Sequence, residues 1–206
     1  MKKLLLSCLL AAGSCSAVAE TINFDALPVG GVPPGWQTGT SGRKDKSLWT
    51  IEADATAPSA PNVLRQSGSS AYPWCVKTGT SFTNGMVEVK FKPVSGERAQ
   101  AGGIMFRFKD ATNYYVARAN ANENNVNLYW FDAQGRHEVK AVSTPVSLGQ
   151  WHTLRVDYEG KHIRVAMDGK TLIELDDEHV TGPGAVGLWT RFDSNTMFDD
   201  FTFTGT

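Results

Sequence analysis

The clearest pattern along the chain is a strict alternation of apolar and polar residues that begins near Gly85. At residues 87–91 every second side chain is apolar and charged residues stand between them, and residues 104–108 repeat this period of two. Such a period places one face of a β-strand in a core and the other toward water. Both segments are therefore predicted to be strands of a half-buried sheet.

Similar apolar segments follow along the rest of the chain, with Gly, Asn or Asp between them, and Asp168-Gly169 predicts a tight hairpin. Regularly spaced strands without helical segments favour an antiparallel sandwich over βαβ units. We therefore predict an all-β fold, an antiparallel two-sheet jelly-roll sandwich, as a single domain over residues 20–206. The other strands are expected at residues 22–24, 49–52, 63–66, 114–120, 125–131, around 139, 151–158, 163–167, 172–175, 185–189 and 197–203.

The charge balance narrows the class of partner. The 206 residues contain 20 Lys and Arg against 21 Asp and Glu. Nucleic-acid binding requires a basic surface, which this composition does not supply, so nucleic acid is excluded as a partner. The oligomeric state does not follow from the composition.

The N-terminus has the pattern of a secretory signal peptide over residues 1–19. Lys2 and Lys3 precede an apolar run, and small residues lead to Ala19. The run is shorter than the roughly 20 residues that span a bilayer, so no membrane span is expected. We predict a periplasmic or extracellular protein; in an alternative, Cys15 would carry a lipid anchor.

Cleavage after Ala19 would also remove two of the three cysteines. Cys75 would then be the one cysteine left, so no intramolecular disulfide is expected. With no thiolate-stabilising neighbour beyond Lys77, Cys75 is interpreted as a buried structural residue.

Several motifs in the second half of the chain carry a family resemblance. They are GIMFR at 103–107, NYYVARAN at 113–120, WHTLRV at 151–156, MDGK at 167–170, and GLWTRFDS followed by FDDF at 187–201. In this order they resemble the concanavalin A-like, laminin-G-like jelly roll, and more narrowly the bacterial secreted 3-keto-disaccharide hydrolase-like group. The resemblance implies two sheets, one of them concave, with the concave face and its rim loops as a sugar-binding surface.

Sugars are bound by aromatic platforms and by planar polar side chains, and the alternation places such residues away from the core. Arg107 opposes the apolar stripe of its strand. At 114–120 the apolar set could be either parity, and the polarity of Arg118 favours Tyr115 as a core residue. In the alternative interpretation all these side chains are solvated outer-face residues. The predicted ligand-binding set, which the resemblance also marks, is Arg107, Arg118, Asn120, Trp189, Arg191 and Asp193.

Catalytic residues cannot be named from the sequence. The acids in the string 174–178 have the Glu-x-Asp-x-Glu spacing of some glycoside hydrolases, but they stand at a strand end, which argues against catalysis. Cleavage of a 3-keto-glycoside would instead need a base and an electrophile near the ketone. His137, His152 and His162 lie on or near strands without an identifiable acidic partner, and His152 is interpreted as a packed core or edge residue.

Calcium is the one cofactor that the resemblance implies. It would place side-chain ligands at Asp25 and Asp200, and in the alternative Asp199 and Asp200 bond backbone amides instead. The sequence as a whole predicts a secreted carbohydrate-binding or carbohydrate-recognition domain. One alternative is a 3-keto-disaccharide hydrolase-like, glycoside-cleaving enzyme, and the second is an envelope protein-interaction module.

Overall fold

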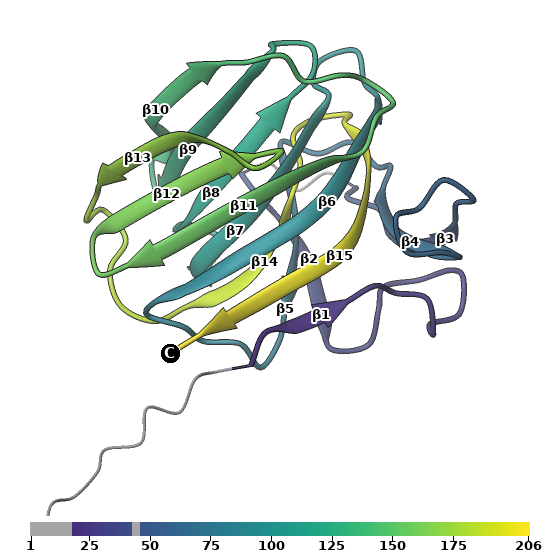
Figure 1. Cartoon of the computed structure of the whole chain (residues 1–206), viewed down its shortest axis with the longest axis horizontal. Helices are drawn as coiled ribbons and strands as arrows, with labels where there is room; N and C mark the ends of the chain where they lie inside the picture. The colour runs from purple at the N-terminus through teal and green to yellow at the C-terminus, as the bar shows by residue number, and fades with distance from the viewer. Residues whose placement is uncertain (1–17, 43–45) are drawn as a thin grey trace, which may run out of the picture.

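A computed structural model describes residues 18–42 and 46–206 of the chain. The described residues form two antiparallel sheets packed face to face, without a helix (Figure 1). This confirms the predicted all-β, two-sheet jelly-roll architecture. No helix in the described part of the chain is long and apolar enough to cross a membrane.

Sheet A is drawn in front in Figure 1, and sheet B lies behind it. In spatial order, sheet A contains β13 (Lys170–Asp176), β12 (His162–Met167), β11 (His152–Glu159), β6 (Gly85–Ser95), β15 (Asn195–Gly205), β4 (Asn62–Gln66) and β3 (Trp49–Ala53), with β1 (Glu20–Ile22) paired to β15. Sheet B contains β10 (Gly135–Ser143), β9 (Asn125–Asp132), β8 (Asn113–Asn120), β7 (Ala101–Asp110), β14 (Ala185–Trp189), β5 (Tyr72–Lys77) and β2 (Trp36–Ser41).

The core between the sheets is built from the alternating positions that the sequence predicted. Val87 and Phe91 of β6 and Ile104 of β7 are completely buried in it. The two sheets approach closely at Gly102, where a Cβ atom would lie 2.6 Å from the ring of Phe91. A glycine is required there because any side chain would overlap the ring.

Strands β12 and β13 are joined by the predicted hairpin. Asp168 and Gly169 have φ angles of 50° and 77°, and positive φ at both central positions is the geometry that Asp-Gly favours. The sequence did not predict β2 and β5, which lie side by side in sheet B. Apolar and polar residues do not alternate clearly in either strand. In β2, Gly39 has no side chain, and this leaves room for the indole of Trp74 on β5.

Candidate functional site

The face of sheet B that points away from the core carries an aromatic cluster. Tyr114 of β8 stacks on Phe131 of β9 with ring centroids 4.3 Å apart, and Tyr72 stacks on Trp189 at 5.9 Å. Most of these rings are buried: Tyr114 and Trp189 are completely buried and Phe131 is 2% exposed, so they form a second apolar cluster on this side of sheet B. The polar residues described next lie beside this cluster.

Arg118 of β8 is the centre of the polar part of this face. Its side chain is completely buried, and its Nη2 donates to Glu123 Oε2 at 2.8 Å, Asn125 Oδ1 at 2.9 Å and Asn127 Oδ1 at 3.1 Å. Asn127 stands opposite Arg118 in the β8–β9 register. Glu123 lies in the turn between these two strands, and Asn125 is the first residue of β9. The pairing of β8 with β9 therefore brings all four groups together.

A second arginine, Arg136 of β10, lies over the ring of Tyr129, with 4.2 Å between the guanidinium carbon and the ring centroid. The guanidinium of Arg118 lies 5.5 Å from the same centroid. Glu138 of β10 accepts a hydrogen bond from Asn127 Nδ2 at 3.0 Å. Cation–π contacts of this kind hold arginine side chains in fixed positions.

The third arginine, Arg191, follows β14. Its Nη1 lies 3.7 Å from Glu123 Oε1, and its guanidinium carbon is 4.5 Å from the ring centroid of Phe192. The guanidinium carbon of Arg98 lies 3.8 Å from the centroid of the same ring. We call Arg118, Arg136 and Arg191, with the carboxylates of Glu123 and Glu138, the arginine cluster.

The electrostatics of the cluster favour the charged form of Glu123 and disfavour that of Arg191. Burial alone would raise the pKa of Glu123, but the hydrogen bond and the positive charge of Arg118 outweigh it, so the pKa lies below its usual value. Burial and the neighbouring positive charges of Arg136 and Arg118 lower the pKa of Arg191. An ionised carboxylate thus stands between guanidinium groups that repel one another.

Comparison with known proteins identifies the family. A family model described as "3-keto-alpha-glucoside-1,2-lyase-like domain" matches residues 30–204. The chain belongs to this family. The match covers both sheets and all members of the arginine cluster.

Individual relatives are similar to this chain in sequence or in fold. The levanase of Bacillus subtilis (strain 168) is 24% identical over 155 residues, which are 75% of this chain and 22% of the levanase. The carbohydrate binding module CBM66 from Bacillus subtilis superposes with a TM-score of 0.68 at 22% identity, over 83% of this chain and 96% of the module. Lectin II from Ulex europaeus gives 0.61 at 8% identity, over 91% and 97%.

The structure separates the predicted ligand-binding residues into groups. Arg118 and Arg191 belong to the arginine cluster. Asn120 lies beside it, and its side chain contributes to lowering the pKa of Glu123. Trp189 is completely buried beneath Tyr72, so it supports the site rather than facing a ligand.

Asp193 has a different role from the predicted one. Its carboxylate accepts hydrogen bonds from the backbone N–H groups of Glu97, Arg98 and Ala99, at 2.8 to 3.2 Å. It therefore orders the loop that carries Arg98 behind Phe192. Asp193 acts on the edge of the site through this loop.

Arg107 does not join the others, and this corrects the prediction. Its side chain is 1% exposed, and its guanidinium donates to the backbone carbonyls of Thr83, Val180 and Gly160. The register of β7 with β8 shifts between Phe106 and Asp110, and Arg107 has a φ angle of 49°. Alternation fails at such an irregularity because a bulged residue no longer points where the pleat would place it. Arg107 ties three loops together.

The alternation gave a sound prediction for β8. Tyr115 and Ala117 are core residues, and Arg118 faces outward. Several members of the site were missed, although Asn127 and Tyr129 oppose the apolar parity of β9 and could have been found from it. Arg136 and Glu138 gave a weaker signal because β10 is largely exposed, and its register shifts at Glu138.

The four histidines have acidic partners that the sequence did not reveal. His152 packs against Phe91 with centroids 5.6 Å apart, as expected of a packed edge residue. His137 and His179 stack on Trp130, each at 4.3 Å. The pairs are His137 with Asp132, His152 with Asp168, His162 with Glu174 and Asp176, and His179 with Asp177, at 2.8 to 3.2 Å.

The acidic string after the β12–β13 hairpin is used structurally. Glu174 and Asp176 pair with His162 on the outer edge of sheet A. Asp177 turns inward and accepts a hydrogen bond from the hydroxyl of Tyr115. The string thus makes its contacts with His162 and Tyr115 and not with the arginine cluster.

The expected calcium ligands are arranged differently from the prediction. Ser59 joins Asp25 to Asp199 rather than to Asp200: its hydroxyl donates to Asp25, and its backbone N–H donates to Asp199 at 2.8 Å. Within the described part of the chain, no group of three or more His, Cys, Asp or Glu side chains is placed to share a metal ion. Because calcium needs several oxygen ligands, these residues do not fit it as arranged.

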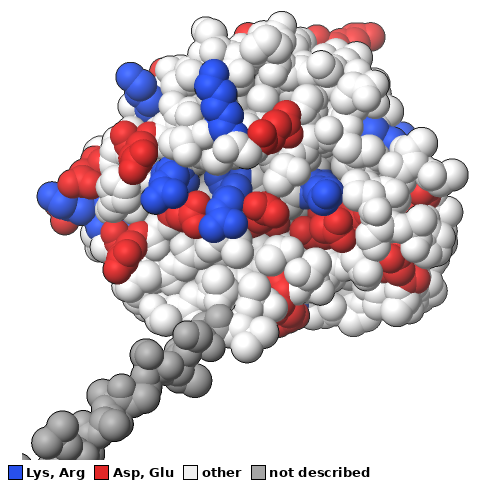
Figure 2. All heavy atoms as spheres, viewed as in Figure 1, with Lys and Arg blue, Asp and Glu red and all other residues white. Residues whose placement is uncertain are grey.

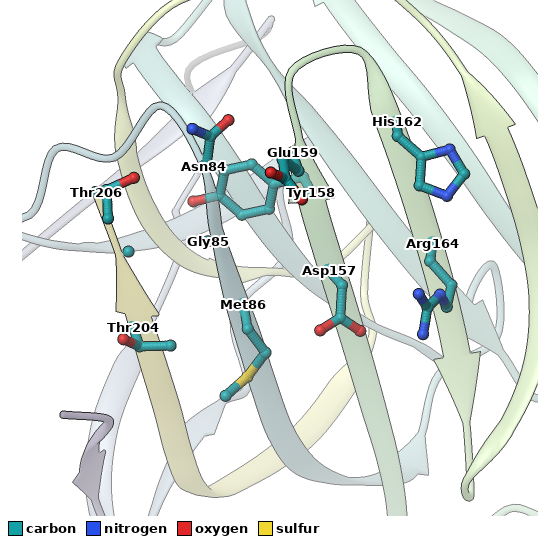
Figure 3. Close-up of a pocket in the computed structure, with 11 residues that line it drawn as sticks. Asn84, Gly85, Met86, Asp157, Tyr158, Glu159, His162, Arg164, Thr204 and Thr206 are labelled. Carbon is teal, nitrogen blue, oxygen red and sulfur yellow. The ribbon is translucent and has the colours of Figure 1, made fainter. Parts of the chain in front are cut away.

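A separate hollow of about 520 Å³ lies on the outer face of sheet A, where β6, β11 and β12 contribute Met86, Asp157 and Arg164 (Figure 3). Charges of both signs are interspersed across this face (Figure 2). They pair with one another, as Asp157 does with Arg155 at 2.6 Å. The ring of Tyr158 at the hollow is only 2% exposed, so no aromatic platform is offered there and we do not assign this hollow as the site.

Proposed function

We propose that the outer face of sheet B binds carbohydrate through the arginine cluster. The observation that carries this proposal is the fully buried guanidinium of Arg118, which three side-chain acceptors fix in place beside the ring of Tyr129. A polar network this rigid, set next to aromatic rings, is what specific recognition of sugar hydroxyl groups requires. A levanase relative and a carbohydrate binding module of the same fold support the proposal.

The roles of the groups follow from their chemistry. Guanidinium groups donate pairs of hydrogen bonds in one plane to neighbouring oxygens, and the carboxylates of Glu123 and Glu138 accept from hydroxyl groups. Tyr72 offers an aromatic face to the apolar side of a sugar ring. Arg118 holds the network together from below, and Arg191, whose side chain is 20% exposed, is the accessible donor.

A second candidate function is cleavage of a 3-keto-glycoside, which the family match favours. In that reaction a base removes the proton on C2, the resulting enolate expels the C1 oxygen with its bonding pair, and the leaving sugar takes up a proton. Glu123 would be the base, because it is an ionised carboxylate between Arg118 and Arg191. The two guanidinium groups would stabilise the enolate oxygen.

A glycan array followed by a 3-keto-glucoside turnover assay separates these candidates. We expect saturable sugar binding that Arg191→Gln weakens at least tenfold, since charge-assisted hydrogen bonds are lost. Arg155→Gln on sheet A is the matched control and should bind like the wild type. Turnover abolished by Glu123→Gln would favour the lyase, and binding of an envelope protein without any sugar signal would favour an interaction module.

The cellular location is a separate proposal. The N-terminal pattern supports secretion with cleavage after Ala19, but its residues 1–17 lie outside the described part of the chain. Fractionation of cells that express the full chain, with N-terminal sequencing of the product, tests it. Recovery of the uncleaved chain in the cytoplasm would contradict the proposal, and a lipid on Cys15 would favour the anchored alternative.

A further inference from the structure

The unsatisfied groups in the arginine cluster are all donors of the same kind. Nε and Nη1 of Arg118, Nη1 of Arg136 and Nε of Arg191 are shielded from solvent and have no hydrogen-bond partner among the described residues. Buried donors without partners cost free energy until an acceptor reaches them. A ligand rich in acceptors would satisfy these donors.

One oxygen of each carboxylate in the cluster is already engaged. Oε2 of Glu123 accepts from both Arg118 and Asn125, and Oε2 of Glu138 accepts from Asn127. The cluster contains three guanidinium groups and two carboxylates, so positive charge is in excess. The lowered pKa of Arg191, caused by burial and then by the charges of Arg136 and Arg118, reflects the same excess.

We propose that the sugar recognised by this site is anionic, and that its carboxylate or sulfate enters between Arg191 and Arg136. This inference rests on the proposed carbohydrate binding and specifies its ligand class. A carboxylate or sulfate offers acceptor oxygens and no donor, and it neutralises the excess positive charge. A hydroxyl group at the same place would leave the excess positive charge unneutralised and would bring a proton that itself needs an acceptor.

The geometry gives the two ends of the ligand different surroundings. Arg191 is 20% exposed and Arg118 is completely buried, so the anionic group approaches from the side of Arg191. Tyr72 lies 5.7 Å from the guanidinium carbon of Arg136, close enough to contact the ring that carries the anion. Glu123 and Glu138 then face the hydroxyl groups of that ring or repel a second anion, which limits the site to one charge.

The test compares ligands that differ only in charge. Tetragalacturonate, its methyl ester and a neutral galactan oligomer are titrated calorimetrically into the protein at low and at physiological salt, and a sulfated galactan oligomer separates sulfate from carboxylate. We expect the acid to bind about tenfold more tightly than its ester, because charge-assisted hydrogen bonds are roughly twice as strong as neutral ones. This preference should shrink at the higher salt concentration.

Two variants localise the effect. Arg136→Gln should remove most of the preference for the acid while the ester still binds, and Glu123→Gln should strengthen binding of the acid relative to the ester. Arg155→Gln on sheet A, which loses a charge at a distant surface, should leave the preference unchanged. Circular dichroism and thermal unfolding confirm that each variant is folded before its binding is compared.

The outcomes distinguish the two proposals. If the neutral oligomer or the ester binds as tightly as the acid, the inference of an anionic ligand is overturned while carbohydrate binding stands. If polyglutamate competes as well as tetragalacturonate, the site is a general anion patch, which also overturns the inference. If no sugar in a wide glycan array binds, the proposed function itself fails.

Discussion

Arg118 and Glu123, five residues apart across the β8–β9 turn, form a 2.8 Å ion pair in which the guanidinium is fully buried and the carboxylate side chain is 38% exposed. A buried charge is stable only when it is paired and hydrogen-bonded, and here the two N–H groups of one guanidinium nitrogen are shared among three acceptors. The turn between two neighbouring strands thereby fixes the position of the central arginine of the site. The first two predictions concern this pair.

Replacing the buried member should affect both stability and binding. Arg118→Leu keeps the apolar contacts but leaves Asn125 and Asn127 without their donor, so we expect a loss of about 2 to 4 kcal/mol in the free energy of unfolding and a loss of sugar binding. Urea denaturation and calorimetry measure the two effects. A variant with unchanged stability and unchanged affinity would show that Arg118 does not organise the site.

The exposed member should give a pH dependence. The pKa of Glu123 lies below its usual value of 4.5 in the folded protein, so its contribution to stability is present above that pH and is lost as the pH falls through the lowered value. Wild-type protein should therefore lose stability relative to Glu123→Gln on acidification below about pH 4.5. Thermal unfolding of both proteins across this range checks the sign. Parallel curves would contradict it.

Arg107 should prove to be structural. Arg107→Lys keeps the charge but cannot reach the carbonyls of Thr83, Val180 and Gly160 together, so we expect a loss of about 2 to 3 kcal/mol in the free energy of unfolding. Sugar affinity at the arginine cluster should be nearly unchanged at a temperature where the variant is folded. Loss of binding with unaltered stability would instead place Arg107 in the site.

The close approach of the two sheets can be tested at Gly102. In Gly102→Ala the new methyl group would overlap the ring of Phe91, which lies 2.6 Å from its position, so we expect destabilisation by about 1 to 3 kcal/mol. The double variant with Phe91→Leu should recover part of this loss, because the smaller side chain leaves space. Additive losses in a double-mutant cycle would show that the ring is not the obstacle.

Cys75 should react only after unfolding. It is completely buried, and burial raises the pKa of its thiol, so little thiolate forms and none is accessible. A chromogenic disulfide reagent should modify the native protein very slowly and the urea-unfolded protein at once. Rapid reaction in native buffer would indicate that β5 opens readily.

Much of the fold was predictable because the residues along one strand by themselves decide which of its faces is buried. The alternation at 87–91 and at 104–106 identified the residues that pack between the sheets, and the polarity of Arg118 resolved the parity of β8. The prediction missed β2 and β5, since the glycine and the tryptophan that interlock there have meaning only once the two strands are paired.

The candidate site was only half predictable, for a different physical reason. Which side chains meet across a sheet depends on strand order and register, so the sequence could name Arg118 and Arg191 but not their association with Arg136. Arg107 illustrates the opposite error. Its position in the alternation predicted an outward-facing side chain, but an irregularity in β7 directs the guanidinium toward backbone carbonyls.

The sequence by itself determined the all-β class, the core faces of the main strands and the supply of outward-facing arginines, because each depends on residues that are neighbours along one strand. Only the tertiary structure decided which arginines share a site, because the order β10-β9-β8-β7-β14 brings together residues that are distant in the chain. It also decided that several of their buried N–H groups have no acceptor among the described residues. This unsatisfied hydrogen-bonding capacity, a property of the assembled face, supports the proposed site and the proposed ligand class.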